Sequence, residues 1–299
     1  MNHIITDLQQ KFRKGDICLK FIYANIGIFL ILAFTNILFR LFNLPEASFV
    51  RYLEFPAQIT SAIKQPWSLL TYMFLHANIL HLLFNMLWLY WFGRLFLYSY
   101  SARHFQGLYL LGGIVGGILY LLAYNVFPYF HPMLEHSMLL GASASVLAIV
   151  IATAINNPEY PLQFLFIGAI RLKYVAIIVV LMDLLLITSN NSGGHIAHIG
   201  GALAGWWFAI GIKRGSYDAT AWINIAIDSI GKWFNPRAKS AKPRMKVHYG
   251  NKRSKDYEYN ARQKAQSDEI DRILDKIRQT GYEGLSSEEK KTLFDASKK

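Results

Sequence analysis

The stretch Met138–Val150 reads M-L-L-G-A-S-A-S-V-L-A-I-V and sets one glycine and two serines at the start of a long apolar segment. A Gly-x-Ser arrangement presents the nucleophile in many serine hydrolases, because a small neighbouring residue lets the serine stand clear of its helix. Small residues in a membrane helix also form packing surfaces, so Gly141 and Ser143 alone do not define a site. Their interpretation as a nucleophile site requires a base and oxyanion donors at the same depth in other segments.

The composition of the chain predicts a membrane protein. Of its 299 residues, 53% are hydrophobic, and the mean hydropathy of +0.24 is too high for an ordinary soluble domain. Much of the net charge of +12 lies in the first 20 residues and after residue 212. Basic flanks beside apolar spans are typical of cytoplasmic ends near anionic lipid, so we expect a lipid bilayer and no nucleic acid as partner. The single cysteine, Cys18, excludes an intramolecular disulfide and a cysteine-based metal site.

Six apolar segments predict an all-α membrane protein with a bundle of six transmembrane helices. The expected spans are residues 21–42, 80–98, 107–127, 140–155, 174–188 and 195–212. The fourth is short, so its N-terminal end should lie within the bilayer depth beside a water-filled cavity. The connection 43–75 is expected to be a partly helical loop at the membrane surface, and 161–173 to lie along the inner face. The distribution of basic residues predicts that both termini are cytoplasmic.

The chain divides by composition into four parts. These are a cytoplasmic N-terminal segment (1–20), the membrane domain (21–213), an amphipathic and basic linker (214–262) and a small cytoplasmic helical hairpin (263–299). The amphipathic stretch 216–234 should lie on the inner leaflet, and the rest of the linker is expected to be disordered. In the hairpin, Ser286 followed by Glu289 is a capping box that opens the second helix. We expect the hairpin to bind a cytoplasmic partner.

Stripes of small residues predict that the fourth and sixth spans dock closely. His198, Gly201 (or Ala202) and Gly205 fall on one face of the sixth span, and Ala144, Ala148 and Ala152 form a matching stripe on the fourth. Docking these stripes would bring Ser143 near His198, and both spans enter the membrane from the outer side. We therefore expect Gly205 to tolerate no side chain, whereas Gly211, near the inner end, should tolerate one.

The second span supplies candidate oxyanion donors at the same depth. His81 and Asn85 are four residues apart and share a helical face. Polar side chains in an apolar span are costly and mark function by default. Together with the backbone N–H of Ser143, they are suited to stabilise a developing oxyanion.

Three motifs resemble those of the rhomboid family of intramembrane serine proteases. They are H-A-N-I-L-H-L-L-F-N at His76–Asn85, G-A-S-A at Gly141–Ala144 and A-H-I-G-G-A-L-A-G at Ala197–Gly205. The resemblance covers about residues 20–213. It implies a six-helix fold and a catalytic Ser143–His198 dyad without an aspartate, with His81 and Asn85 near the oxyanion. It implies no cofactor, and the chain has no H-E-x-x-H motif for a catalytic metal.

The sequence departs from the family pattern at three positions. Ser68 stands where the family has an arginine, Ala144 replaces a frequent glycine after the nucleophile, and Leu147 replaces a tyrosine that stacks on the catalytic histidine. His76 is assigned no chemistry, and His195 is a candidate neighbour of the site.

Two further polar residues lie near the proposed site in the sequence. Ser145 is rotated about 200° from Ser143 on an ideal helix and should not share its cavity. Asp183 is expected to bond a neighbouring helix and not to complete a triad.

The sequence thus predicts an intramembrane serine endopeptidase that cleaves transmembrane segments of membrane proteins, expected in a bacterial inner membrane. One alternative is a proteolytically inactive rhomboid-like protein that binds membrane clients, against which the presence of both Ser143 and His198 argues. A second is a transporter or channel, which would favour more midplane charge and internal repeats than this sequence has.

Overall fold

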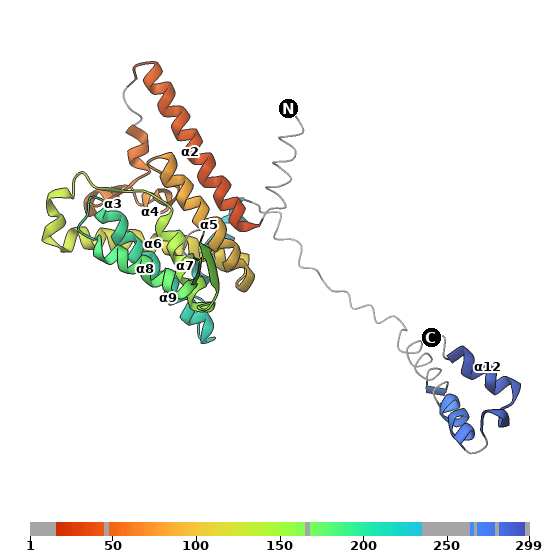
Figure 1. The fold of residues 1–299 in the computed structure, drawn as a ribbon. Helices are drawn as coiled ribbons and strands as arrows, with labels where there is room; N and C mark the ends of the chain where they lie inside the picture. The colour runs from red at the N-terminus through yellow and green to blue at the C-terminus, as the bar shows by residue number, and fades with distance from the viewer. Residues whose placement is uncertain are drawn as a thin grey trace. The chain divides into compact units, whose positions relative to one another are not determined.

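A computed structural model describes residues 16–44, 48–164, 168–234, 264–265, 268–278 and 281–296 (Figure 1). The chain forms two compact units, residues 1–236 and 237–299. Residues 1–15 of the basic N-terminal segment and the part of the linker expected to be disordered, 235–262, lie outside the described residues.

The first unit is mostly helical, and each of the six expected spans overlaps one helix. The bounds are α2 (Ile17–Leu41), α5 (Ile79–Ser99), α6 (Ala102–Val126), α7 (Ser143–Asn156), α8 (Leu172–Leu185) and α9 (Ser192–Lys213). Within the described residues, α2, α5, α6 and α9 are long and apolar enough to cross a membrane by length and composition. Helices α7 and α8 have 14 residues each. At 1.5 Å per residue they are about 21 Å long, shorter than the roughly 30 Å hydrocarbon core.

The connection between α2 and α5 is partly helical, as expected. It contains η1 (Ser48–Tyr52), β1 (Phe55–Pro56), α3 (Ile59–Lys64), α4 (Ser68–Thr71) and η2 (Tyr72–Phe74). Strand β1 pairs antiparallel with β2 (Met138–Leu139), which follows η3 (Pro128–Met133), with Phe55 opposite Leu139. This pairing ties the long connection to the segment directly before α7, where the candidate nucleophile lies.

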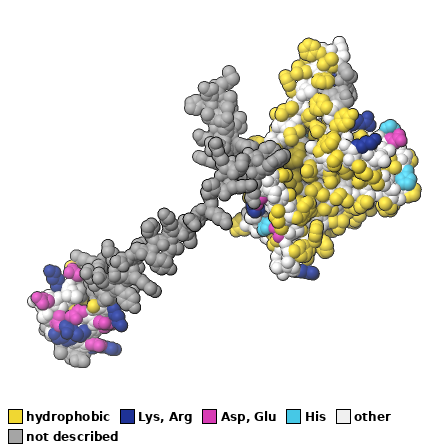
Figure 2. All heavy atoms as spheres, turned by 180° about the vertical axis from the view of Figure 1, so that it is seen from behind, with side chains coloured by type: hydrophobic (Ala, Val, Ile, Leu, Met, Phe, Trp, Pro, Cys, Tyr) yellow, Lys and Arg dark blue, Asp and Glu magenta, His cyan; other side chains and the backbone are white. Residues whose placement is uncertain are grey.

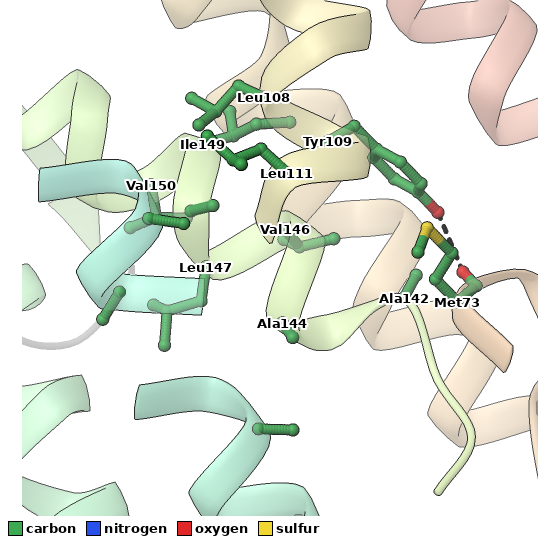
Figure 3. Close-up of a cluster of buried hydrophobic side chains, with 14 of the residues drawn as sticks. Met73, Leu108, Tyr109, Leu111, Ala142, Ala144, Val146, Leu147, Ile149 and Val150 are labelled. Atoms are coloured by element: carbon green, nitrogen blue, oxygen red, sulfur yellow. Dashed lines mark hydrogen bonds between the residues drawn. The ribbon is translucent and has the colours of Figure 1, made fainter. Parts of the chain in front are cut away.

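Helix α7 forms the centre of the first unit. Its side chains from Ala144 to Ala154 are buried. In Figure 3, Val146, Ile149 and Val150 of α7 lie in an apolar cluster with side chains of α6. On α6, Tyr109 donates a hydrogen bond of 3.0 Å to the carbonyl of Met73, which joins the cluster to η2.

The close docking of α7 and α9 that the small residues predict is confirmed. A Cβ atom on Gly201 would lie 2.1 Å from the carbonyl oxygen of Ala144, and one on Gly205 would lie 2.3 Å from that of Ala148. Glycines of α6 pack on the other side of α7, where a Cβ on Gly112 would meet the Cβ of Ala148 at 2.5 Å. Real Cβ atoms do not approach other atoms this closely, so backbones fix the spacing of these three helices.

The expectation that Gly211 tolerates a side chain is wrong. A Cβ atom there would lie 2.5 Å from the ring of Tyr217 and 2.7 Å from its carbonyl oxygen. Tyr217 lies in the turn between α9 and α10 (Ala221–Phe234), and the chain folds back onto α9 at this point. The contact depends on that turn and has no periodic signal in the sequence.

The remaining elements of the first unit lie at its periphery. Strand β3 (Pro161–Phe164) pairs antiparallel with β4 (Gly168–Arg171), which leads directly into α8. Helix α10 packs on the start of α6, where Arg103 pairs with Asp228 and Gln106 donates to Asn224. Its side chains Trp222, Ile225 and Ile230 are exposed, as an interfacial helix requires.

Exposed apolar side chains cover much of the first unit, whereas the visible surface of the second unit carries many charged ones (Figure 2). On α2, Ile31 and Phe34 are more than half exposed. Such a contiguous apolar surface fits contact with lipid or another protein. This contrast supports a membrane location for the first unit.

The second unit contains two helical segments, residues 268–278 and α12 (Ser287–Ala296), joined through η5 (Tyr282–Gly284). Ile273 and Leu285 are buried in this unit. The expected capping box is confirmed, because Ser286 Oγ accepts from the Glu289 N–H and Glu289 Oε2 accepts from the Ser286 N–H. The Ser286 N–H and the ammonium of Lys276 lower the pKa of Glu289 to about 2.

Candidate active site

The four residues singled out by sequence border one cavity. The cavity has a volume of about 700 Å³, and its walls include Ser143, His198, His81 and Asn85. These side chains come from three helices, α7, α9 and α5, that enter the unit from the same side. The rest of the wall includes Tyr120 and Tyr124 of α6, Val179 of α8, and the β2 segment.

Ser143 is the first residue of α7 and follows an unusual backbone turn. Gly141 has φ +132°, a conformation that side-chain-bearing residues rarely adopt, and its N–H donates to the carbonyl of Tyr72 at 3.0 Å. A Cβ atom on Gly141 would lie 2.9 Å from the His81 ring and 3.6 Å from Ser143 Oγ. The absence of a side chain at Gly141 therefore leaves open the space that borders both Ser143 and His81.

The N-terminus of α7 supplies backbone donors beside Ser143 Oγ. The first N–H groups of a helix have no partner within the helix, and they favour negative charge nearby. An oxyanion formed at Ser143 would lie close to these donors. Among the described residues, the Ser143 hydroxyl makes no hydrogen bond. Catalytic hydrogen bonds are often long before substrate binds, so this does not argue against a nucleophile.

His81 and Asn85 are positioned by hydrogen bonds within α5. The Asn78 side chain caps the helix by accepting from the His81 N–H at 2.9 Å, and Asn85 Nδ2 donates to the His81 carbonyl at 2.9 Å. Asn85 is 7% exposed and still borders the cavity. One N–H of its amide is held by the helix, and the second is available to a bound group.

His198 is hydrogen-bonded to Asp183, which the sequence predicted to bond a neighbouring helix and not to complete a triad. Nδ1 of His198 lies 2.9 Å from Oδ1 of Asp183 on α8, and Nδ1 of His195 lies 2.8 Å from the same oxygen. Asp183 thus bonds a neighbouring helix, as expected, but the bond is made to the candidate base itself. His195 does not border the cavity.

Within the described ranges, the group of side chains whose ligand atoms could hold a metal ion consists of Asp183, His195 and His198, because these atoms lie within 4.8 Å of one another. Two ligands on one tetrahedral zinc ion, at about 2.0–2.1 Å each, lie about 3.3 Å apart. The observed separations of 2.8 and 2.9 Å are those of hydrogen bonds. The geometry therefore assigns both contacts as hydrogen bonds to the carboxylate.

The other polar residues named from the sequence lie away from the cavity. Ser145 is fully buried with its hydroxyl 3.9 Å from Met73 Sδ, and it does not border the cavity, as expected. Ser68 is buried and donates to the Gln65 carbonyl. Both ring nitrogens of His76 are buried and have no hydrogen-bond partner within the described ranges, and its ring meets that of His81 edge to face at 5.1 Å. Leu147, at the position of the family's tyrosine, borders the cavity.

The fold and the cavity define a multi-helix membrane protein with a serine, two histidines and an asparagine converging near the ends of its helices. A family model described as the rhomboid domain matches residues 64–215, and the chain belongs to the rhomboid family. A second model, a family of unknown function (DUF6576), matches residues 253–299.

A curated relative has a name that agrees with this family. The chain is 26% identical over 202 residues to the RHOMBOID-like protein 12, mitochondrial, of Arabidopsis thaliana. The match covers 64% of this chain and 57% of the plant protein, so the chain spans just over half the length of that relative.

Proposed function

We propose that this chain is an intramembrane serine endopeptidase that hydrolyses peptide bonds in transmembrane segments of membrane proteins. The observation that carries the proposal is the convergence of Ser143, His198, His81 and Asn85 on one cavity from three different helices. Each polar side chain alone fits a buried contact between helices. A nucleophile, a base and two donors around one volume fit acyl transfer.

The proposed reaction uses these residues in two steps. His198 Nε2 takes the proton of Ser143 Oγ, and the oxygen attacks the carbonyl carbon of the scissile bond. The N–H of Ser143 and the side chains of His81 and Asn85 stabilise the resulting oxyanion. His198 then gives its proton to the leaving amine, and a water molecule, deprotonated by His198, releases the acyl group from Ser143.

The fold supports access for a membrane substrate. Because α7 is shorter than the hydrocarbon core, its N-terminus lies below the bilayer surface when its other end reaches the opposite surface. That other end is marked by ion pairs of Glu159 with Arg171 and Lys173. The substrate helix must unwind locally to present a bond, so helix-weakening residues near its outer end are expected.

Our proposed topology has six membrane-crossing helices, with the short α7 and α8 among them, and both termini on one side. The relative is named as mitochondrial, and this gives no support to the bacterial inner membrane expected from the sequence. The second unit is proposed to bind a partner on the side where the termini lie.

Cleavage of a model transmembrane substrate by purified protein in detergent tests the proposal. The wild type should cleave it, and Ser143→Ala and His198→Ala should each abolish cleavage with no loss of folding. Cleavage that survives in Ser143→Ala would rule out this nucleophile. A folded wild type that binds such segments and leaves all of them intact would favour the inactive rhomboid-like alternative.

A further inference from the structure

The contact between α8 and α9 is unusual for a membrane helix pair because it centres on a carboxylate. Asp183 is 5% exposed, and the hydrogen bonds that its side chain makes among the described residues go to His195 and His198. Its other oxygen, Oδ2, is buried and has no hydrogen-bond partner in the part of the chain that the structure describes. An ionisable residue within an apolar helix is costly, and its position is a sign of function.

The hydrogen bond to Asp183 determines which nitrogen of His198 is free. An ionised carboxylate only accepts hydrogen bonds, so Nδ1 of His198 carries the hydrogen and donates it. Nε2 of His198 is then unprotonated and able to accept a proton. His198 borders the same cavity as Ser143, so the unprotonated nitrogen belongs to the imidazole proposed as the base for Ser143.

The other groups around His198 do not supply this restraint. From α5 the titratable group at the cavity is His81, and from α6 the groups are Tyr120 and Tyr124. From α7 the polar side chain at the cavity is Ser143 itself. Among the described residues, none of these groups bonds Nδ1 of His198, whereas Asp183 on α8 does.

We propose that Asp183 is a positioning residue for the proposed protease reaction. It holds Nδ1 of His198 by a hydrogen bond, so that Nε2 can accept the proton of Ser143. Its negative charge stabilises the imidazolium that forms when His198 takes this proton. His195 donates to the same oxygen and so helps to hold the carboxylate in place. The proposal rests on the proposed function and replaces the expected dyad with a Ser143–His198–Asp183 arrangement.

The test compares Asp183→Asn with the wild type in cleavage of a model transmembrane substrate. Asparagine keeps the shape of the side chain and removes the charge. We expect kcat to fall by roughly 10²- to 10⁴-fold, as with loss of the carboxylate in a serine protease triad, while KM stays unchanged. Asp183→Glu should recover part of kcat, and His195→Ala should lower kcat less than Asp183→Asn.

A matched control separates positioning from loss of a buried polar contact. Asn25 is fully buried on α2 and donates to Tyr109 of α6, away from the cavity. Asn25→Leu should lower thermal stability without the large fall in kcat at saturating substrate. If it lowers kcat as much as Asp183→Asn does, or if Asp183→Asn keeps wild-type kcat, the positioning role is refuted.

A spectroscopic measurement tests the same proposal without cleavage. In protein with ¹⁵N-labelled histidine, the His198 signals should report the Nδ1–H tautomer in Ser143→Ala and lose this preference in Ser143→Ala combined with Asp183→Ala. If no substrate is cleaved but this tautomer depends on Asp183, the proposed function fails and the positioning holds. If cleavage depends on Ser143 and the tautomer is independent of Asp183, the function holds and the positioning fails. Loss of wild-type cleavage on chelation, with recovery on adding zinc, would overturn the hydrogen-bond assignment.

Discussion

Helix α9 contacts α7 through glycines and α8 through polar side chains, and the two interfaces have different roles. At the first interface, Gly201 and Gly205 pack directly against the backbone of α7, and neither position has room for a Cβ atom. Towards α8, His195 and His198 share one oxygen of Asp183. The first interface sets the distance between the helices that carry Ser143 and His198. The second sets the orientation of one imidazole ring.

A side chain at the glycine interface is expected to lower both stability and activity. In Gly205→Val the added atoms would meet the Ala148 carbonyl, a backbone group that cannot move aside alone. Overpacking of this kind destabilises by about 1–3 kcal/mol. Displacement of α9 by about 1 Å would lower activity on the order of 100-fold. Melting temperature and cleavage rate in one detergent measure both effects.

Gly27 of α2 is the matched control for this change, because a Cβ atom there would have nothing within 4 Å. Gly27→Val should keep the activity and most of the stability of the wild type. Wild-type activity and stability in Gly205→Val would mean that the α7–α9 spacing is not set by this contact.

On the wall of the cavity formed by α5, the expected effect is a fall in kcat. Asn85→Ala should lower kcat by a factor on the order of 10 to 1,000, as does loss of one oxyanion donor in other enzymes. The residual rate should exceed that of Ser143→Ala, because the Ser143 N–H and His81 remain. Steady-state kinetics on a model substrate give the value.

Asn125→Ala controls for the helix contact of Asn85. Both side chains donate to the carbonyl four residues earlier, at 2.9 Å for Asn85 and 2.8 Å for Asn125. Asn125 also donates to the Ala57 carbonyl at 2.7 Å, and it does not border the cavity. Similar losses of kcat in the two variants would assign Asn85 a structural role.

The smallest effect on cleavage is expected in the second unit, where charged groups stabilise a short helix. The pKa of Glu289 is lowered to about 2 in the folded unit. Its carboxylate therefore stabilises the capping box at every pH above the pKa that Glu289 has in the unfolded chain. This contribution is lost as pH falls towards 2. Glu289→Gln should therefore speed amide hydrogen exchange in residues 287–296 at neutral pH and leave cleavage unchanged.

Glu288→Gln is the control, since the Glu288 carboxylate takes part in none of the side-chain hydrogen bonds or ion pairs of the described residues. Equal exchange in the two variants would show that the capping box does not depend on the charge of Glu289.

Much of the fold and of the candidate site could be predicted from local sequence patterns. The docking of α7 on α9 follows from small residues at helical spacing, since Ala144 and Ala148 match Gly201 and Gly205. The placement of His81 and Asn85 follows from their separation of four residues on one helix and from the common entry side of α5, α7 and α9. Periodicity and topology were enough for these features.

Other features depend on contacts that no local pattern encodes. The bond from Asp183 to His198 depends on how α8 is rotated against α9, and the connection between these helices carries no signal for that rotation. The two-residue pairing of β1 with β2 is too short to show alternation. Tyr217 reaches Gly211 because the chain turns back after α9. Each of these contacts is a product of tertiary packing.

Covalent labelling of the purified protein with a serine-reactive fluorophosphonate tests directly whether Ser143 is the nucleophile. Ser143 borders the cavity, and Ser145 is fully buried on another face of α7. We predict that the wild type and Ser145→Ala are labelled, that Ser143→Ala is not, and that His198→Ala is labelled far more slowly. Labelling of Ser143→Ala at the wild-type rate would exclude Ser143 as the nucleophile.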